Sequence, residues 1–230
     1  TNDSFRELIY LWQEHKLVNI KEYDGKYVFF NNINDILLYD RPTLEWLEND
    51  LIYNIGLFGN PFIPINSYLN SVWTFWPRQP KLLQQFLTQN TYNTFQQRYI
   101  NSIFIGNIEN NIQNMYRSNK WQSYIDFFEL TYTSEHKYSH NDYLKLLSFS
   151  KFGLCLRGFG PKCNRDIEYL ALGVVLLITD LDSLHYYNKL IENKHYIFIN
   201  NPQDLLKLHN ISETTWNYMV DKLENELEYH

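Results

Sequence analysis

The segment between residues 152 and 179 constrains the fold of this chain more than any other part of it. A short apolar run at Phe152–Leu156 is followed by a glycine loop, Gly158-Phe-Gly-Pro161. The pattern then predicts a helix over Arg165–Leu172. Val174–Thr179 is a continuous apolar run rich in β-branched residues, as in a strand that is buried on both faces. Strand, loop, helix and strand at this spacing predict a parallel sheet with right-handed crossovers.

The ends of that helix are marked by residues that favour helix termini. Asn164 is a suitable N-cap, and Gly173 is a suitable stop. Hydrophobic periodicity and turn residues predict the other elements in the same way. The helices are expected at Phe5–His15, Lys81–Leu87, Ile108–Arg117 and Asp142–Phe149, from Asn201-Pro202, and from Ser212. The strands are expected at Tyr27–Phe30, Ile36–Tyr39, Leu51–Phe58, Ser102–Gly106, Tyr124–Leu130 and His195–Ile199.

A polar stretch at Asn90–Gln97 is the candidate boundary between two domains. We therefore expect an α/β protein with two domains, residues 1–95 and 96–230.

Composition excludes several classes of protein. The chain has a net charge of −6 and a pI near 5.6, without the basic footprint of a nucleic-acid binder. No apolar run reaches the roughly 20 residues that span a bilayer, so we expect no membrane span. Two cysteines, Cys155 and Cys163, cannot form a disulfide framework, although a single bridge is open to them. A reduced, cytoplasmic setting is favoured.

The glycine loop and the start of the following helix are the candidate binding site. Glycines let backbone N–H groups approach a phosphate closely, and the helix N-terminus adds partial positive charge. Arg165 in the first turn can clasp a diphosphate with its planar guanidinium. Glu168, one turn deeper, can accept hydrogen bonds from both ribose hydroxyls. The residues expected to bind this nucleotide ligand are Arg157, Gly158, Gly160, Lys162, Arg165 and Glu168. A simple turn followed by a solvated Arg165–Glu168 pair would account for the same pattern.

The run Ser150-Lys-Phe-Gly-Leu-Cys-Leu-Arg-Gly-Phe-Gly160, followed by Asn164-Arg-Asp-Ile-Glu-Tyr-Leu-Ala-Leu-Gly173, resembles the donor half of exostosin-like glycosyltransferases. The resemblance covers about residues 96–200. It implies the α/β fold called GT-B, in which two Rossmann-like lobes, residues 1–95 and 96–230, hold the active site in the cleft between them and the last helix can cross back onto the first lobe. It also implies that Arg165 lies near the donor diphosphate and Glu168 on the ribose.

Three segments of the first lobe resemble signature segments of a virus- and microbe-associated branch of such transferases. They are Leu38-Tyr-Asp-Arg-Pro-Thr43, Leu57-Phe-Gly-Asn-Pro61 and Trp76-Pro-Arg-Gln-Pro-Lys81. A viral member would work in the host cytoplasm. The first lobe is short for a complete acceptor lobe.

The expected reaction moves a sugar from a UDP- or GDP-sugar to a hydroxyl of a glycan or glycoconjugate acceptor. Arg165 would stabilise the leaving diphosphate, so we expect no metal ion or other cofactor. A catalytic base would lie on the first lobe, facing the cleft. Asp40 is the best candidate because it follows the expected strand Ile36–Tyr39, although Arg41 beside it can simply pair with it.

Two other functions stay open. Asp180-Leu-Asp182 follows an apolar strand, as does the metal-binding Asp-X-Asp of GT-A glycosyltransferases. It stands late in the chain, with little room after it for an acceptor-binding half. The second alternative is a non-catalytic module that binds a nucleotide sugar or a glycan, which fits the short first lobe.

Two further groups of residues have a functional and a structural interpretation. His136 and His140 are four residues apart and can share a helix face as metal ligands, but their polar neighbours favour a loop. Trp73, Phe75 and Trp76 can stack on a sugar ring, whereas core packing or loop anchoring is the simpler role.

Overall fold

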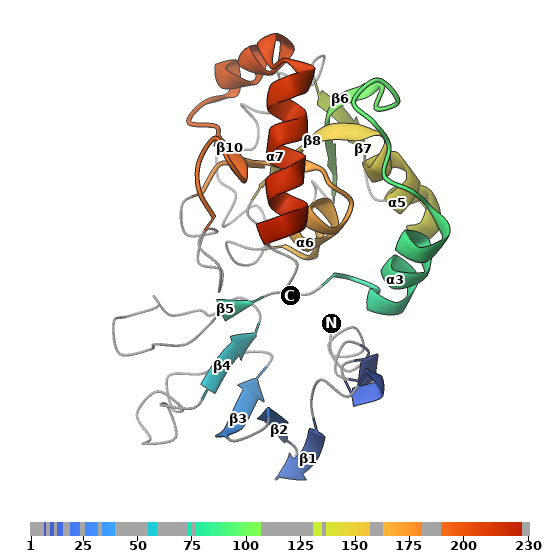
Figure 1. Cartoon of the computed structure of the whole chain (residues 1–230), viewed down its shortest axis with the longest axis vertical. Helices are drawn as coiled ribbons and strands as arrows, with labels where there is room; N and C mark the ends of the chain where they lie inside the picture. Colours follow the sequence, from blue (N-terminus) through green and yellow to red (C-terminus); the bar gives the residue numbers. More distant parts are fainter. Residues whose placement is uncertain are drawn as a thin grey trace.

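The computed structural model describes two β-sheets, with helices packed on the second (Figure 1). Side chains are described for residues 77–106, 137–156, 163–180 and 190–225, and for a few helical residues between 7 and 15. The first sheet and one strand of the second are described by their backbone. The expected helix at 108–117 and the expected strand at 124–130 lie outside the described residues.

The second sheet is parallel throughout and has a doubly wound strand order. Its strands are β6 (Ile100–Ile105), β7 (Thr131–Ser134), β8 (Ser150–Cys155), β9 (Val175–Ile178) and β10 (Tyr196–Phe198). They lie in the order β10-β9-β8-β6-β7, and all neighbouring pairs are parallel. Counted along the chain this order is 2-1-3-4-5, so the direction of winding reverses between β6 and β8. The predicted parallel α/β sheet is thereby confirmed.

The first sheet has a mixed arrangement. Its strands are β1 (Asn19–Tyr23), β2 (Lys26–Asn31), β3 (Asn34–Tyr39), β4 (Ile55–Phe58) and β5 (Trp73–Thr74). The pairs β1–β2 and β2–β3 are antiparallel, whereas β3–β4 and β4–β5 are parallel. The sequence did not predict β1 or β5. This sheet therefore departs from the all-parallel sheet of a Rossmann lobe at its β1–β3 end.

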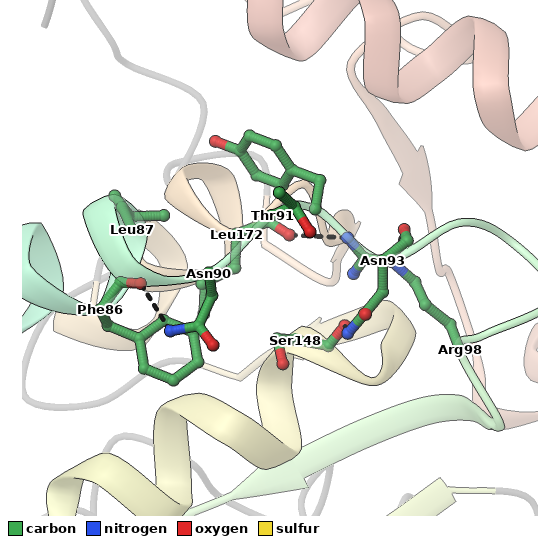
Figure 2. Close-up of a pocket in the computed structure, with 9 residues that line it drawn as sticks. Phe86, Leu87, Asn90, Thr91, Asn93, Arg98, Ser148 and Leu172 are labelled. Atoms are coloured by element: carbon green, nitrogen blue, oxygen red, sulfur yellow. Dashed lines mark hydrogen bonds between the residues drawn. The ribbon is translucent and has the colours of Figure 1, made fainter.

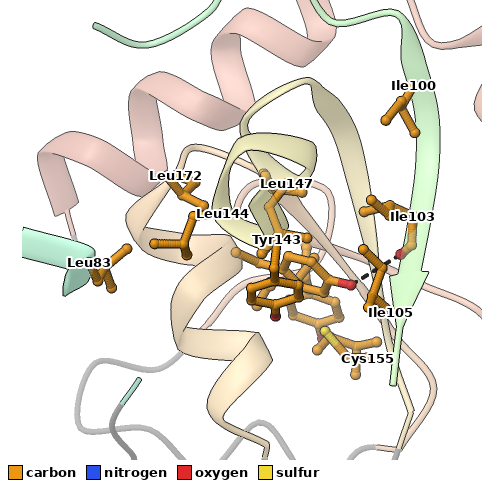
Figure 3. Close-up of a cluster of buried hydrophobic side chains, with 14 of the residues drawn as sticks. Leu83, Ile100, Ile103, Ile105, Tyr143, Leu144, Leu147, Cys155 and Leu172 are labelled. Atoms are coloured by element: carbon orange, nitrogen blue, oxygen red, sulfur yellow. Dashed lines mark hydrogen bonds between the residues drawn. The ribbon is translucent and has the colours of Figure 1, made fainter. Parts of the chain in front are cut away.

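Helices cover both faces of the parallel sheet. They are α3 (Pro80–Gln89), α5 (His140–Ser148), α6 (Asn164–Ala171), the 3₁₀-helix η3 (Pro202–Asn210) and α7 (Glu213–Glu226). One apolar cluster joins α3, α5 and α6 to one face (Figure 3), and another joins η3 and α7 to the other. Alternate residues of a strand enter different clusters: Leu176 faces the first and Leu177 the second. The predicted burial of this strand on both faces is confirmed.

Helix α6 begins one residue earlier than the sequence predicted. Its N-cap is Cys163, with extended backbone angles, and Asn164 is the first helical residue. The carboxylate of Asp166 reaches back and accepts a hydrogen bond from the Cys163 N–H at 2.8 Å. This contact from the first turn satisfies the Cys163 N–H. The predicted stop is confirmed, since Gly173 has a φ of 63°.

Helix α3 belongs to the core of the parallel sheet. Leu83 and Phe86 are buried in the cluster that also contains Leu144 and Leu147 of α5. Residues 80–89 therefore pack with elements that follow them in the chain. The domain boundary at 95/96 stays a prediction.

Gly153 in β8 is packed directly against the ring of Tyr169 in α6. A Cβ at this position would lie 2.5 Å from the Tyr169 ring carbons, well inside van der Waals contact. Tyr169 is fully buried, and its hydroxyl donates to the carbonyl of Ile103 at 3.1 Å, so the ring has little freedom to move. A glycine is required here for α6 to lie on the sheet.

We predict that Gly153→Ala lowers the free energy of unfolding by about 1–3 kcal/mol, the usual cost of an overpacked core. Urea unfolding would measure it. The same substitution in a Tyr169→Leu background should cost clearly less, because the ring that it strikes is gone. Equal costs in both backgrounds would contradict this packing.

Candidate functional site

The candidate site lies at the carboxyl edge of the parallel sheet, between β6 and β8. In doubly wound sheets, ligands bind at this edge where the winding reverses. Arg165, in the first turn of α6, spans that point. Its Nη1 donates to the carbonyl of Ile105 at 2.9 Å, and its Nη2 donates to the carbonyl of Leu156 at 3.3 Å. The guanidinium thus joins the ends of the two strands that flank the reversal.

The surroundings of Arg165 hold its charge in one place. The guanidinium stacks over the Phe104 ring, with Cζ 4.0 Å from the ring centroid. A Cβ at position 106 would lie 2.8 Å from Nη1, so Gly106 leaves the room that this side chain occupies. Burial lowers the pKa of Arg165, but nearby groups, Tyr169 and Cys163 first among them, raise it above its ordinary value. The guanidinium therefore stays charged.

Arg165 is more buried than a residue that lines an open cleft. Only 7% of it is exposed, and both of its Nη atoms bind strand carbonyls. Its Nε is buried and has no hydrogen-bond partner within the part of the chain that the structure describes. Arg165 is thus a structural clamp of the sheet edge, with two of its five N–H donors bound to strand carbonyls.

Glu168 lies one turn further along α6 and is 1% exposed. Its Oε1 accepts a hydrogen bond from the backbone N–H of Arg78 at 2.9 Å. Its Oε2 accepts one from the hydroxyl of Tyr143 at 2.6 Å. The Nε2 of His140 lies 3.7 Å from Oε1. The carboxylate therefore joins α6 to α5 and to residues 77–79, which lie between β5 and α3 in the chain.

Burial dominates the electrostatics of Glu168. It raises the pKa of this carboxyl to about 7 from an ordinary value of 4.5. The hydrogen bonds from Tyr143 and Arg78 and the charge of Arg165 act in the opposite direction. The carboxyl consequently titrates near neutral pH.

Several residues expected at the site lie outside the described residues. They are Arg157, Gly158, Gly160, Lys162, Asp40 and Asp182. The chain order fixes that residues 157–162 connect the carboxyl end of β8 to the N-terminus of α6. The structure thus brings Arg165 and Glu168 to one end of the sheet, and the roles of the other residues stay predictions.

The other candidate residues fall into two groups, those that the structure describes and those that lie outside the described residues. Asp180 is half-buried, two residues past β9. Within the described ranges, no three His, Cys, Asp or Glu side chains come together as metal ligands. Cys155 is buried in β8 and Cys163 caps α6, and both are free thiols. His136, Phe75 and Trp76 lie outside the described residues, and Trp73 is described by its backbone alone.

Sequence reasoning missed the partners of Glu168. Tyr143, His140 and Arg78 come from α5 and from the segment before α3, so no spacing within the motif points to them. Buried Arg98 was also missed, because an isolated arginine after a polar stretch carries no sequence signal.

A shallow hollow lies at the opposite, amino edge of the sheet (Figure 2). It is lined by Asn90, Asn93, Ser148 and Leu172, with the Arg98 side chain beside them. The polar groups there bind one another: Asn93 Nδ2 donates to the Ser148 carbonyl at 3.0 Å, and Arg98 Nη2 donates to the Leu172 carbonyl at 2.8 Å. The hollow offers little unmet bonding capacity to a ligand.

No protein-family model matches the chain, and no curated protein matches it either. None of the helices in the described ranges is both long and apolar enough to cross a bilayer.

The raised pKa of Glu168 predicts a stability that depends on pH. The folded state holds the proton of Glu168 more tightly than the unfolded chain does. The stability that this proton contributes is therefore fully present below about pH 4.5 and is lost as the pH rises through about 7. The loss amounts to about 3 kcal/mol. The difference in unfolding free energy between wild type and Glu168→Gln should therefore fall over this range.

Urea unfolding at pH 5, 6, 7 and 8 would measure that difference. Asp142→Asn serves as the control, because it removes an exposed carboxylate of α5 in place of a buried one. If the difference in unfolding free energy between wild type and Glu168→Gln is constant from pH 5 to 8, the pKa of Glu168 is not raised by burial.

Proposed function

We propose that this chain is a glycosyltransferase that uses a nucleotide-diphosphate sugar and has the two-lobed GT-B arrangement. The observation that carries the proposal is the position of Arg165. Its fixed positive charge stands where the winding of a parallel 2-1-3-4-5 sheet reverses, at the start of α6. A helix N-terminus at this point is a general anion site of doubly wound folds.

The segment before α6 supplies the other groups that a diphosphate needs. Residues 157–162 contain Arg157 and Lys162, with Gly158 and Gly160 between them. Together with Arg165 they place three cations within nine residues of an acidic chain. Backbone N–H groups of such a loop can approach phosphate oxygens closely. This set neutralises a diphosphate without requiring a metal ion.

The proposed reaction makes use of that charge distribution. An acceptor hydroxyl oxygen forms a bond to the anomeric carbon of the donor sugar, and the bond from that carbon to the diphosphate oxygen breaks. Negative charge grows on the leaving diphosphate, where Arg165 and the helix N-terminus stabilise it. The proton of the acceptor passes to a base on the first lobe, for which Asp40 is the candidate.

Glu168 keeps capacity for a second set of hydrogen bonds. Each carboxylate oxygen has two lone-pair sites, and Arg78 and Tyr143 occupy one on each oxygen. The remaining sites can accept the two hydroxyls of a ribose. Glu168 is 1% exposed, so a ribose can reach its carboxylate only if the residues packed over it move.

A non-catalytic nucleotide-binding module is the second candidate. The burial of Arg165 and Glu168 favours it, since both side chains already hold the fold together. Such a module would bind nucleoside diphosphates at the same sheet edge but would neither transfer nor hydrolyse a sugar.

Calorimetric titration with UDP, GDP and their sugars, with and without EDTA, tests the proposal. We expect one nucleotide to bind equally well in EDTA. We expect Arg165→Lys to weaken its binding by at least about tenfold, because Lys cannot bind both strand carbonyls with a planar fork and so no longer holds the charge in its fixed position. Transfer of sugar to a glycan acceptor, assayed under the same conditions, separates the enzyme from the binding module.

Arg98→Lys is the matched control, because it alters a buried arginine at the amino edge of the same sheet. It should lower stability but leave nucleotide affinity within about twofold, on the order of 0.4 kcal/mol. Absence of nucleotide binding to the wild type would refute the proposal. Activity lost in EDTA and restored by manganese would favour the GT-A alternative with Asp180 and Asp182.

A further inference from the structure

Tyr143 is the side chain most closely engaged with the Glu168 carboxylate. It lies on α5, 2% exposed, beside Leu144 and Leu147 of the same apolar cluster (Figure 3). Its hydroxyl donates to Glu168 Oε2 at 2.6 Å, a short contact typical of a hydroxyl bound to a carboxylate. A tyrosine hydroxyl inside an apolar cluster must find such a partner, and this one finds a residue of the candidate site.

The direction of this hydrogen bond is set when Glu168 is ionised. Burial raises the pKa of Tyr143 well above its usual range, and the neighbouring carboxyl of Glu168 raises it further. Tyr143 therefore keeps its proton beside the ionised carboxylate, and the ionised Glu168 is the acceptor. The contact stabilises the ionised carboxylate more than the neutral acid.

Other groups surround the same carboxyl. His140 approaches from α5, the Arg78 backbone N–H binds Oε1, and Arg165 contributes its charge from the same helix. Tyr143 and Arg78 bind different oxygens, so together they fix the rotation of the carboxylate plane. Loss of either donor would free that rotation and favour protonation.

We propose that Tyr143 is a positioning residue of the donor site: its hydroxyl holds Glu168 in the orientation and charge state in which that carboxylate accepts the ribose hydroxyls. The inference rests on the proposed function. It assigns to α5 a part in nucleotide binding, although Tyr143 itself does not touch the nucleotide.

The proposal makes donor binding depend on pH through Glu168. A protonated Glu168 has lost one acceptor oxygen to its own proton, so it holds a ribose less well than the carboxylate. Nucleotide affinity of the wild type should rise with pH, with a midpoint at the titration midpoint of Glu168. Removal of the Tyr143 hydroxyl should move both midpoints upward together.

The test compares Tyr143→Phe with Tyr169→Phe in the full chain. Tyr169 is an equally buried tyrosine, and its hydroxyl donates to the backbone carbonyl of Ile103. Tyr169→Phe therefore also loses one buried hydrogen bond, but not one to Glu168. Carbon-13 NMR of the side-chain carboxyls reports the Glu168 midpoint, with Glu168→Gln to assign the signal. Calorimetry reports the affinity for UDP and GDP between pH 5.5 and 8.5.

We expect Tyr143→Phe to raise the Glu168 midpoint by about 1–2 pH units, since a hydrogen bond to a charged group contributes about 1.5–3 kcal/mol. Nucleotide affinity at pH 7 should then fall by about tenfold, or ~1.4 kcal/mol. Tyr169→Phe should change neither quantity, although both variants lose stability.

Different results overturn different claims. If the wild type binds nucleotide but Tyr143→Phe keeps its Glu168 midpoint and its affinity profile, the positioning role is wrong and the proposed function stands. If the wild type binds no nucleotide at any pH, the proposed function itself fails. If Tyr143→Phe does not fold, the wild type alone tests the inference. A nucleotide affinity that stays constant over the pH range in which Glu168 titrates would refute it.

Discussion

Two buried arginines hold the central strands of the parallel sheet at their opposite ends, and they tie helix and loop ends to those strands. At the amino edge, Arg98 donates to the carbonyls of Asn93, Ser150 and Leu172, at 3.1, 2.6 and 2.8 Å. At the carboxyl edge, Arg165 does the same for the ends of β6 and β8. Strand and helix ends leave carbonyls without partners, and a guanidinium offers five N–H donors in a fixed plane to satisfy them.

The clamp at the carboxyl edge links stability to the proposed function. A cation that neutralises a leaving diphosphate is most effective when it is already fixed before the reaction. The strand carbonyls and the Phe104 ring fix Arg165 in that manner. Glu168 extends the arrangement, because its carboxylate ties α6 to α5 and to the segment before α3. A change at this edge should therefore affect folding and ligand binding together.

The sequence predicts those parts of the fold that local patterns encode. Val174–Thr179 reads as a buried strand because both of its faces are apolar, and Gly173 marks the helix end because it takes a positive φ. The N-cap was misplaced because Asp166, and not the capping residue, supplies the side-chain contact. Residues such as Tyr143 meet Glu168 only through tertiary packing, which no spacing along the chain encodes. Residues 157–162 belong to the expected site but lie outside the described residues.

The carboxyl edge between β6 and β8 is the proposed binding site of a nucleoside diphosphate. The most direct test is a titration of ¹⁵N-labelled protein with UDP and with GDP, followed through backbone amide chemical shifts. We expect saturable shifts that are largest at Gly106, Leu156 and Arg165, at the end of the sheet where α6 begins. Shifts confined to the amino edge, around Ser148 and Leu172, or no shifts with either nucleotide, would contradict it.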